Sequence, residues 1–125
     1  MVALLNEYQL RDKLKLLSAG KLINAGKQFI AMSMGSDAVY TARGFMLAMG
    51  CIQALQCNSN TCPVGITSHN PDLYKGIDIE KKSERIKNYI ESICHDHEEI
   101  LSSLGKKSHK ELSMNNLFYP SSYRR

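Results

Sequence analysis

The sequence contains no run of about 18 apolar residues, so we expect no membrane-spanning helix. Its first segment, Met1 to Lys13, also lacks the basic region and the small-residue cleavage site of a secretory leader, and it becomes polar after Leu5. Four cysteines without an export signal indicate a reducing compartment, where clustered thiols are more often metal ligands or redox groups than disulfides. We therefore predict a cytoplasmic protein with no membrane partner.

Aromatic residues are scarce, at 7% of the chain, and they do not alternate with basic residues. The 16 Lys and Arg outnumber the 12 Asp and Glu, but they are spread from Arg11 to Arg125. A nucleic-acid-binding surface concentrates its positive charge on one face or in a recognisable motif. We therefore predict solvated charge and no nucleic-acid partner. No Ser/His/Asp, Cys/His or paired-carboxylate arrangement has a supporting spacing, so the catalytic residues are unknown.

The first half of the chain alternates short apolar runs with helical segments. Lys13–Leu17 and Asp37–Tyr40 are typical of strands, and a helix is predicted from Ala25 to Met34, capped by Asn24 and stopped by Gly35. Another helix is expected over 45–55. This order predicts a right-handed parallel βαβ unit and the α/β class. Two strands cannot make a sheet that is covered on both faces, so we expect part of the fold to be missing.

The second half is predicted to be irregular over 57–70 and then mostly helical. A turn of helix is expected over 72–75, and a long amphipathic helix over 80–104 ends at Gly105. Cys94 lies beside the apolar stripe of this helix and is interpreted as a packing residue, and the run from His95 to His97 as structural or solvated. A polar tail follows from Lys106, poorly ordered apart from a short helix near 111–117.

Three cysteines, Cys51, Cys57 and Cys62, form a C-x5-C-x4-C pattern that is followed by Pro63. Thiolates are the usual protein ligands of iron–sulfur clusters, and three of them match a [3Fe-4S] type. A zinc site usually has C-x2-C pairs, which are absent here, although His69 or Cys94 could supply a fourth ligand. A disulfide, or three unrelated buried cysteines, also remain open from the spacing alone.

Two small-residue turns, Ser18-Ala19-Gly20 and Ala42-Arg43-Gly44, each follow a predicted strand and precede a helix. If the strands are neighbours in a parallel sheet, both turns lie at the same carboxyl edge. Small residues let backbone N–H groups approach an anion closely, and Arg43 could add a charged contact. The turns are candidate phosphate binders, although glycine turns between strands and helices are also common without a ligand.

The run ARGFMLAMGCIQALQCNSNTCPVGITSHNPDL, residues 42–73, resembles the FMN-binding glutamate synthase family. The segments 10–23 and 31–44 resemble the seventh strand, seventh helix and eighth strand of the same family. The resemblance extends more loosely to about Gly105. It implies the C-terminal portion of a (β/α)8 TIM barrel, strands seven and eight with their helices, plus a C-terminal helical extension. On this basis 1–70 are the end of the barrel with the cluster loop, 71–105 the extension and 106–125 a polar tail.

The resemblance also implies the cofactors FMN and a [3Fe-4S] cluster. Residues that it places at the cluster are Cys51, Cys57 and Cys62, and those that it places around the FMN phosphate are Ser18, Ala19, Gly20, Ala42, Arg43 and Gly44, with Lys21 as an additional contact. Complete members convert 2-oxoglutarate and ammonia to glutamate with electrons that pass through the cluster and FMN. A separate amidotransferase domain releases the ammonia from glutamine.

This chain departs from the family's pattern because a barrel takes roughly 200 residues or more. The first six strands are absent, so the chain is expected to be an inactive fragment unless another chain supplies the missing barrel portion. A truncated product, a split-gene subunit and a remnant are all compatible with this. The alternative is a small stand-alone iron–sulfur or zinc module with an electron-transfer or structural role. Self-association through open strand edges is also expected.

Overall fold

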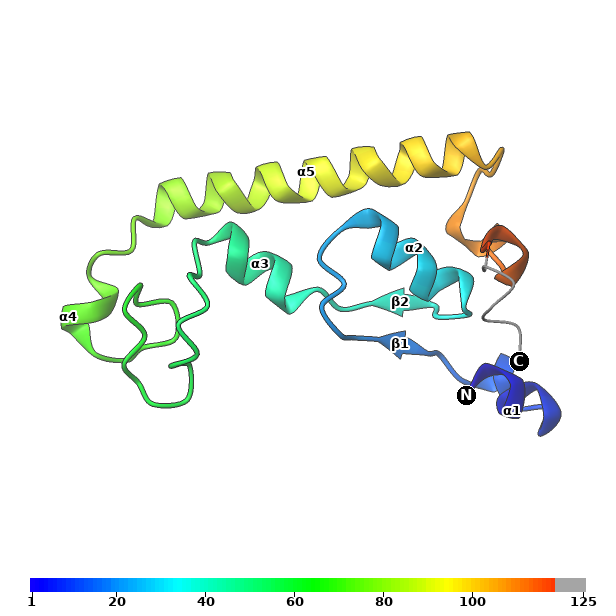
Figure 1. Ribbon diagram of the computed structural model, residues 1–125, viewed down its shortest axis with the longest axis horizontal. Helices are drawn as coiled ribbons and strands as arrows, with labels where there is room; N and C mark the ends of the chain where they lie inside the picture. The colour runs from blue at the N-terminus through cyan, green and yellow to red at the C-terminus, as the bar shows by residue number, and fades with distance from the viewer. Residues whose placement is uncertain (119–125) are drawn as a thin grey trace. The chain divides into compact units, whose positions relative to one another are not determined.

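The computed structural model describes residues 1–118 and has a mixed α/β architecture (Figure 1). It divides into two compact units. The βαβ unit comprises Met1–Thr41 together with the described part of Cys94–Arg125, and the cysteine unit comprises Ala42–Ile93. The α/β class expected from the sequence is confirmed to this extent.

Two strands, β1 (Leu17–Ser18) and β2 (Ala38–Val39), pair in parallel, with Leu17 opposite Ala38 and Ser18 opposite Val39. The predicted parallel βαβ arrangement is therefore confirmed, but both strands are shorter than expected. The first strand was predicted to begin at Lys13, whereas a 3-10 turn occupies η1 (Arg11–Lys13) and the strand begins only at Leu17.

An ion pair explains why the strand starts late. The Arg11 guanidinium lies 2.9 Å from the Asp37 carboxylate and also donates to the carbonyl oxygens of Leu14, at 3.0 Å, and Gly35, at 2.9 Å. The Leu16 N–H donates to the Asp37 side chain at 2.7 Å. The bond from the Leu16 N–H is the largest cause that holds the pKa of Asp37 below its ordinary value, and the bond from Arg11 adds to it. The Leu16 N–H is thus taken by a side chain, while its carbonyl oxygen still accepts a backbone bond from the Asp37 N–H at 2.8 Å.

The helix between the strands, α2 (Ala25–Ser33), begins and ends as predicted within one residue. The Asn24 side chain accepts a bond from the Lys27 N–H at 3.0 Å, which satisfies one of the free donors of the first turn. Gly35 follows the helix with φ of 102°, the left-handed conformation that favours glycine. The buried face of the helix consists of Ala25, Gln28, Phe29 and Ser33.

The next helix, α3 (Ala42–Ala48), corrects the prediction of a helix over 45–55. It starts three residues earlier, so that Ala42, Arg43 and Gly44 form its first turn rather than a separate loop. It ends well before residue 55, because Gly50 has φ of 96° and both Gln53 and Leu55 have positive φ. A helix cannot continue through such a backbone.

Beyond the irregular segment 51–70 lie α4 (Pro71–Tyr74) and α5 (Ile79–Ser103), which confirm the two helices expected there within one residue. Residues of α5 up to Ile93 belong to the cysteine unit and the remainder to the βαβ unit. Gly105 ends the helix with φ of 64°. Cys94 is exposed, so its interpretation as a packing residue is wrong.

The N-terminal segment forms α1 (Val2–Glu7), and the tail forms the 3-10 turns η2 (His109–Glu111) and η3 (Met114–Asn116). The helix predicted near 111–117 is thus replaced by shorter turns. The rest of the predicted tail, 119–125, lies outside the described residues. Within the described part of the chain, no helix combines the length and apolarity needed to cross a membrane.

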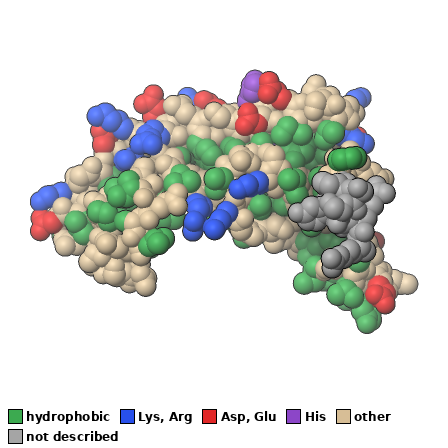
Figure 2. All heavy atoms as spheres, in the orientation of Figure 1, with side chains coloured by type: hydrophobic (Ala, Val, Ile, Leu, Met, Phe, Trp, Pro, Cys, Tyr) green, Lys and Arg blue, Asp and Glu red, His purple; other side chains and the backbone are tan. Residues whose placement is uncertain are grey.

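Few apolar side chains are fully buried in the described residues: the buried ones are Ala25, Phe29 and Cys62. In the βαβ unit, by contrast, Leu4, Leu14 and Leu17 are about half exposed, at 56%, 46% and 53%. Figure 2 shows apolar side chains at the surface around α1, at the lower right of the view. The two-stranded sheet therefore leaves much of its apolar surface uncovered.

Candidate functional site

The three patterned cysteines all lie in the cysteine unit and all are free thiols. Cys51 comes shortly after α3 and is half-buried, Cys57 is exposed, and Cys62 is buried with 8% of its surface accessible. Cys51 falls within the helix predicted over 45–55, but α3 ends at Ala48, so Cys51 lies in the loop after it. No disulfide joins these residues.

Hydrogen bonds to a single asparagine fix the loop that carries Cys57 and Cys62. Asn60 has φ of 61°, a conformation that asparagine tolerates better than most residues. Its side-chain Oδ1 accepts a bond from the His69 N–H at 2.6 Å, and its carbonyl oxygen accepts one from the buried Ser68 hydroxyl at 2.9 Å. The two ends of the loop are thereby held together without an apolar core.

A close backbone approach at Gly65 fixes the other side of the loop. Gly65 has φ of 75°, and a Cβ at this position would lie 2.5 Å from the Leu73 carbonyl oxygen and 2.7 Å from the Tyr74 Cα. Because those atoms are backbone atoms of α4 and its last turn, they cannot rotate away as a flexible side chain would. Only glycine allows the loop to pack against α4 in this way.

The sulfur of Cys62 lies among hydrogen-bond donors that favour its charged form. The backbone N–H of Thr67 is the largest cause of a pKa lowered to about 7, and the N–H groups of Val64 and Ile66 act in the same direction, while burial opposes them. The Thr67 hydroxyl also contributes, although it has no partner of ordinary hydrogen-bond geometry among the described residues. Such a cradle stabilises a thiolate, the form that binds metals.

Cys51 and Cys57 line one small cavity of about 100 Å³, together with apolar side chains of α3 and the following loop. The Cys51 sulfur accepts a bond from the Gln53 N–H at 3.4 Å. Arg43, which the sequence predicted at a phosphate, lies on α3 and also lines this cavity. The structure thus brings two of the three cysteines and one cation to a shared space.

The spacing of the thiols bears on the type of metal group that they fit. Among the described residues, one set of three metal-binding side chains has its ligand atoms within 4.8 Å of one another, and it contains no cysteine. The thiols therefore do not form a compact single-ion site such as tetrahedral zinc. Backbone N–H donors lie at two of the three sulfurs, those of Cys51 and Cys62.

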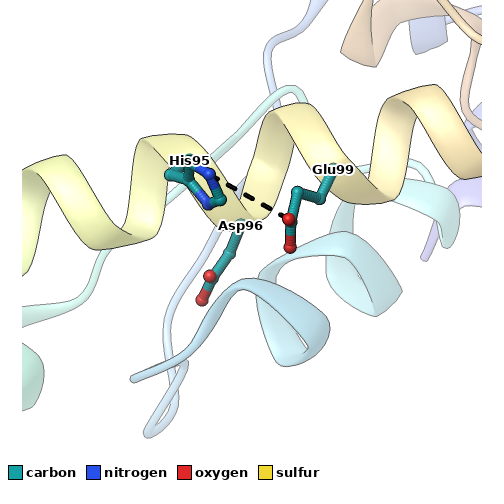
Figure 3. Close-up of side chains that lie close together, drawn as sticks. All are labelled: His95, Asp96 and Glu99. Atoms are coloured by element: carbon teal, nitrogen blue, oxygen red, sulfur yellow. Dashed lines mark ion pairs between the residues drawn. The ribbon is translucent and has the colours of Figure 1, made fainter.

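The one set of metal-binding side chains that lie this close together consists of His95, Asp96 and Glu99, on the exposed surface of α5 (Figure 3). His95 Nε2 lies 4.0 Å from Glu99 Oε1, one helical turn away. Ion pairs at this spacing are common on solvated helices. This agrees with the prediction of a solvated or structural role for the residues around His95.

The first predicted phosphate turn begins at the carboxyl end of β1. Ser18 is the last residue of the strand, and Ser18 and Ala19 line an open groove of about 800 Å³ in the βαβ unit. Gly20 and Lys21 follow with φ of 137° and 57°. The two strands end at the same edge, as predicted, while the second set, Ala42 to Gly44, lies in the other unit.

Sequence reasoning missed a buried polar chain in the βαβ unit. His97 Nδ1 lies 2.7 Å from His109 Nε2, and His97 Nε2 lies 2.8 Å from Gln28 Oε1. Gln28 Nε2 donates to the Leu22 carbonyl oxygen at 3.0 Å, so Oε1 must accept from His97. The ring of Phe29 lies 4.9 Å from that of His97, centre to centre. The position of His97 on the apolar stripe of the long helix was the one sequence feature that could have indicated its burial. Nothing in the sequence around His109 indicated its contact with His97.

Comparison with known proteins identifies the family to which the chain belongs. Residues 1–107 match the conserved region in glutamate synthase. The chain is 37% identical over 116 residues to the glutamate synthase large subunit-like protein YerD of Bacillus subtilis, covering 93% of this chain and 22% of that protein. It is 32% identical over 111 residues to the archaeal glutamate synthase [NADPH] of Methanocaldococcus jannaschii, covering 89% and 22%.

A third relative is the ferredoxin-dependent glutamate synthase of Pyropia yezoensis, 34% identical over 116 residues, which cover 90% of this chain and 7% of that protein. The chain thus spans about a fifth, or less, of the length of these relatives. The matched region nevertheless includes both strands, all three patterned cysteines and all of α5. By this match the chain belongs to the glutamate synthase family.

Proposed function

We propose that this chain supplies the iron–sulfur ligands and part of the FMN phosphate site of a glutamate synthase-type oxidoreductase. Cys51, Cys57 and Cys62 would hold a [3Fe-4S] cluster, which would carry single electrons to or from the flavin. The observation that carries the proposal is the cradle of N–H groups around the Cys62 sulfur, which lowers the pKa of this buried thiol to about 7. A cysteine that only fills space has no need of such donors.

The flavin part of the proposal rests on the carboxyl edge of the two parallel strands. Ser18 ends β1 at that edge and is followed by Ala19, Gly20 and Lys21, while Ala42, Arg43 and Gly44 follow β2 in sequence. Loops after the last two strands of a (β/α)8 barrel often bind phosphate. The groove beside Ser18 is open, so a phosphate could reach the backbone there.

Glutamate formation from 2-oxoglutarate and ammonia would need the remainder of a barrel. The groove in the βαβ unit is lined mainly by apolar side chains, including Met1, Leu17 and Met34, which are 82%, 53% and 51% exposed. Parallel strands in proteins are covered on both faces. We infer that further strands and helices cover the apolar part of this groove, away from Ser18, in the active protein, and that the chain self-associates without them.

Reconstitution of the chain with iron and sulfide under anaerobic conditions tests the cluster. We expect about three irons per chain and the visible absorption of an iron–sulfur cluster. Cys51→Ser, Cys57→Ser and Cys62→Ser should each reduce the iron content several-fold, whereas Cys94→Ser, the matched control at an exposed cysteine, should not. Tight binding of zinc with no cluster absorption would refute the proposal.

A second candidate function is a stand-alone cluster-binding module that transfers electrons. Its supporting observation is that all three cysteines and the bonds that hold their loop lie within one compact unit, the cysteine unit. Flavin binding discriminates the two. The isolated chain should bind FMN weakly or not at all in either case, but addition of the missing barrel portion should create stoichiometric FMN binding only for the synthase.

A further inference from the structure

Two cations of α5 lie against the backbone immediately before Cys51. A Cβ at Gly50 would lie 2.9 Å from Lys82 Nζ and 3.4 Å from Arg85 Nη1. Consecutive Cα atoms are about 3.8 Å apart, so both positive groups lie within about 9 Å of the Cα of Cys51, the first of the three patterned cysteines. All of these residues belong to the cysteine unit.

Packing within the cysteine unit holds the two cations there. Lys82 and Arg85 are three residues apart on α5, and Tyr89 is four residues further on, so the three side chains leave the same face of the helix. The Tyr89 ring contacts the Phe45 ring of α3 edge to face, with centres 5.6 Å apart. This aromatic pair fixes α5 against α3, and Gly50 follows α3 directly.

The two cations are not used in surface ion pairs. Their helix neighbours Lys81 and Lys87 pair with Asp78, at 3.2 Å, and Glu91, at 3.7 Å. Within residues 1–118, neither Lys82 nor Arg85 lies within ion-pair distance of a carboxylate, and Lys82 is half-buried. The Lys82 ammonium does act on the Asp78 carboxyl, whose pKa it helps to lower, but that carboxylate already pairs with Lys81.

We propose that Lys82 and Arg85 raise the reduction potential of the iron–sulfur cluster held by Cys51, Cys57 and Cys62, an inference that rests on the function proposed above. Three thiolates make the group anionic, and reduction adds one more electron, taken from a one-electron donor. Nearby positive charge stabilises the added negative charge, and net charge is one of the factors that set cluster potentials. The cations thereby favour acceptance of the electron.

The test is a redox titration of the reconstituted full chain, followed by visible absorption and electron paramagnetic resonance. In the double variant Lys82→Gln/Arg85→Gln, we expect the ratio of oxidised to reduced cluster at a fixed potential to rise about tenfold, a shift of about 59 mV to lower potential for a one-electron couple. The charge-retaining double variant Lys82→Arg/Arg85→Lys should titrate like the unchanged chain.

Lys87→Gln is the matched control, because it removes a positive charge from the same helix at a residue with no contact to Gly50. An unchanged potential in the Lys82→Gln/Arg85→Gln variant, or an equal shift in the control, would overturn this inference and leave the proposed function standing. Failure of the unchanged chain to bind a cluster would overturn it together with the proposed function. If the double variant does not fold, the single variants should each give part of the shift, and a shift in neither would overturn the inference.

Discussion

The cysteine unit and the βαβ unit differ in how far their own residues complete them. The loop of the cysteine unit is held by polar and backbone contacts, such as those of Asn60 and Gly65, which need no large core. The βαβ unit instead exposes Leu14 and Leu17 beside a two-stranded sheet. A ligand loop can thus be specified locally, whereas a parallel strand pair depends on further strands to cover it.

The largest effect is expected from Gly65→Ala, which would break the cysteine unit while sparing the βαβ unit. The added Cβ would meet backbone atoms at 2.5 Å and 2.7 Å in a conformation that alanine disfavours. We expect a loss of more than about 3 kcal/mol from the local stability of the loop, and loss of iron binding. Hydrogen exchange of the amides over 60–74 measures the first effect and iron content the second.

Gly76→Ala is the control for this comparison, because a Cβ there meets nothing within 4 Å and the residue lacks a left-handed backbone. It should leave both loop protection and iron content unchanged. Equal exchange rates in the Gly65→Ala variant and the unchanged chain would show that the loop does not depend on this backbone approach.

A smaller effect is expected from Gln28→Ala, which would weaken the βαβ unit instead. The change removes the acceptor of the buried His97 Nε2–H and one donor to the Leu22 carbonyl oxygen. Leaving a buried donor without a partner costs about 2 kcal/mol. Urea unfolding followed by circular dichroism measures the loss, and the exposed neighbour Lys27→Ala should not reproduce it. Equal losses in the two variants would contradict the role of the polar chain.

The smallest expected effect is a pH dependence confined to the βαβ unit. Burial is the main cause that lowers the pKa of His97 below its ordinary value of 6.5, and His109 adds to it, while Asp96 opposes both. The unfolded chain therefore binds a proton more readily than the folded chain as the pH falls below about 6.5. The contribution of His97 to the free energy of unfolding is fully present above that pH. It is lost as the pH falls from there through the lower pKa that His97 has in the folded chain.

Unfolding in urea at about pH 7.5 and about pH 5.5 measures this loss. His97→Gln should reduce the difference in the free energy of unfolding between the two pH values, because glutamine does not titrate. The control is His95→Gln, at an exposed position of the same helix, which should preserve the difference. A pH difference that survives His97→Gln would assign the effect to another group.

Local signals in the sequence predicted the helices well. Asn24 and Gly35 gave the limits of α2, and Gly105 gave the end of α5, because caps and left-handed stops depend on residues within the same turn. The end of α3 was predicted wrongly, since Gln53 and Leu55 adopt positive φ without any residue preference that announces it. The predicted start of the first strand at Lys13 was wrong for a different reason, because Arg11 pairs with Asp37, which is distant in the sequence.

The candidate site shows the same division. The spacing of Cys51, Cys57 and Cys62, together with the family resemblance, predicted these residues as cluster ligands, but it could not predict the N–H cradle around one sulfur, which depends on how the loop folds back. The approach of Lys82 to Gly50 joins positions far apart in the sequence and could not be predicted from periodicity. Contacts of this range require the folded chain.

The backbone contact at Gly65 has a consequence for how sequence variation in this protein should be read. Every substitution at a glycine adds at least a Cβ, so a library of variants should show complete intolerance at this position, as strict as at a cysteine ligand. Gly65 nevertheless supplies no side chain to any chemistry. Intolerance to mutation in this loop therefore marks positions that shape the backbone as readily as positions that bind, and only the measurement of iron content in stable variants separates the two.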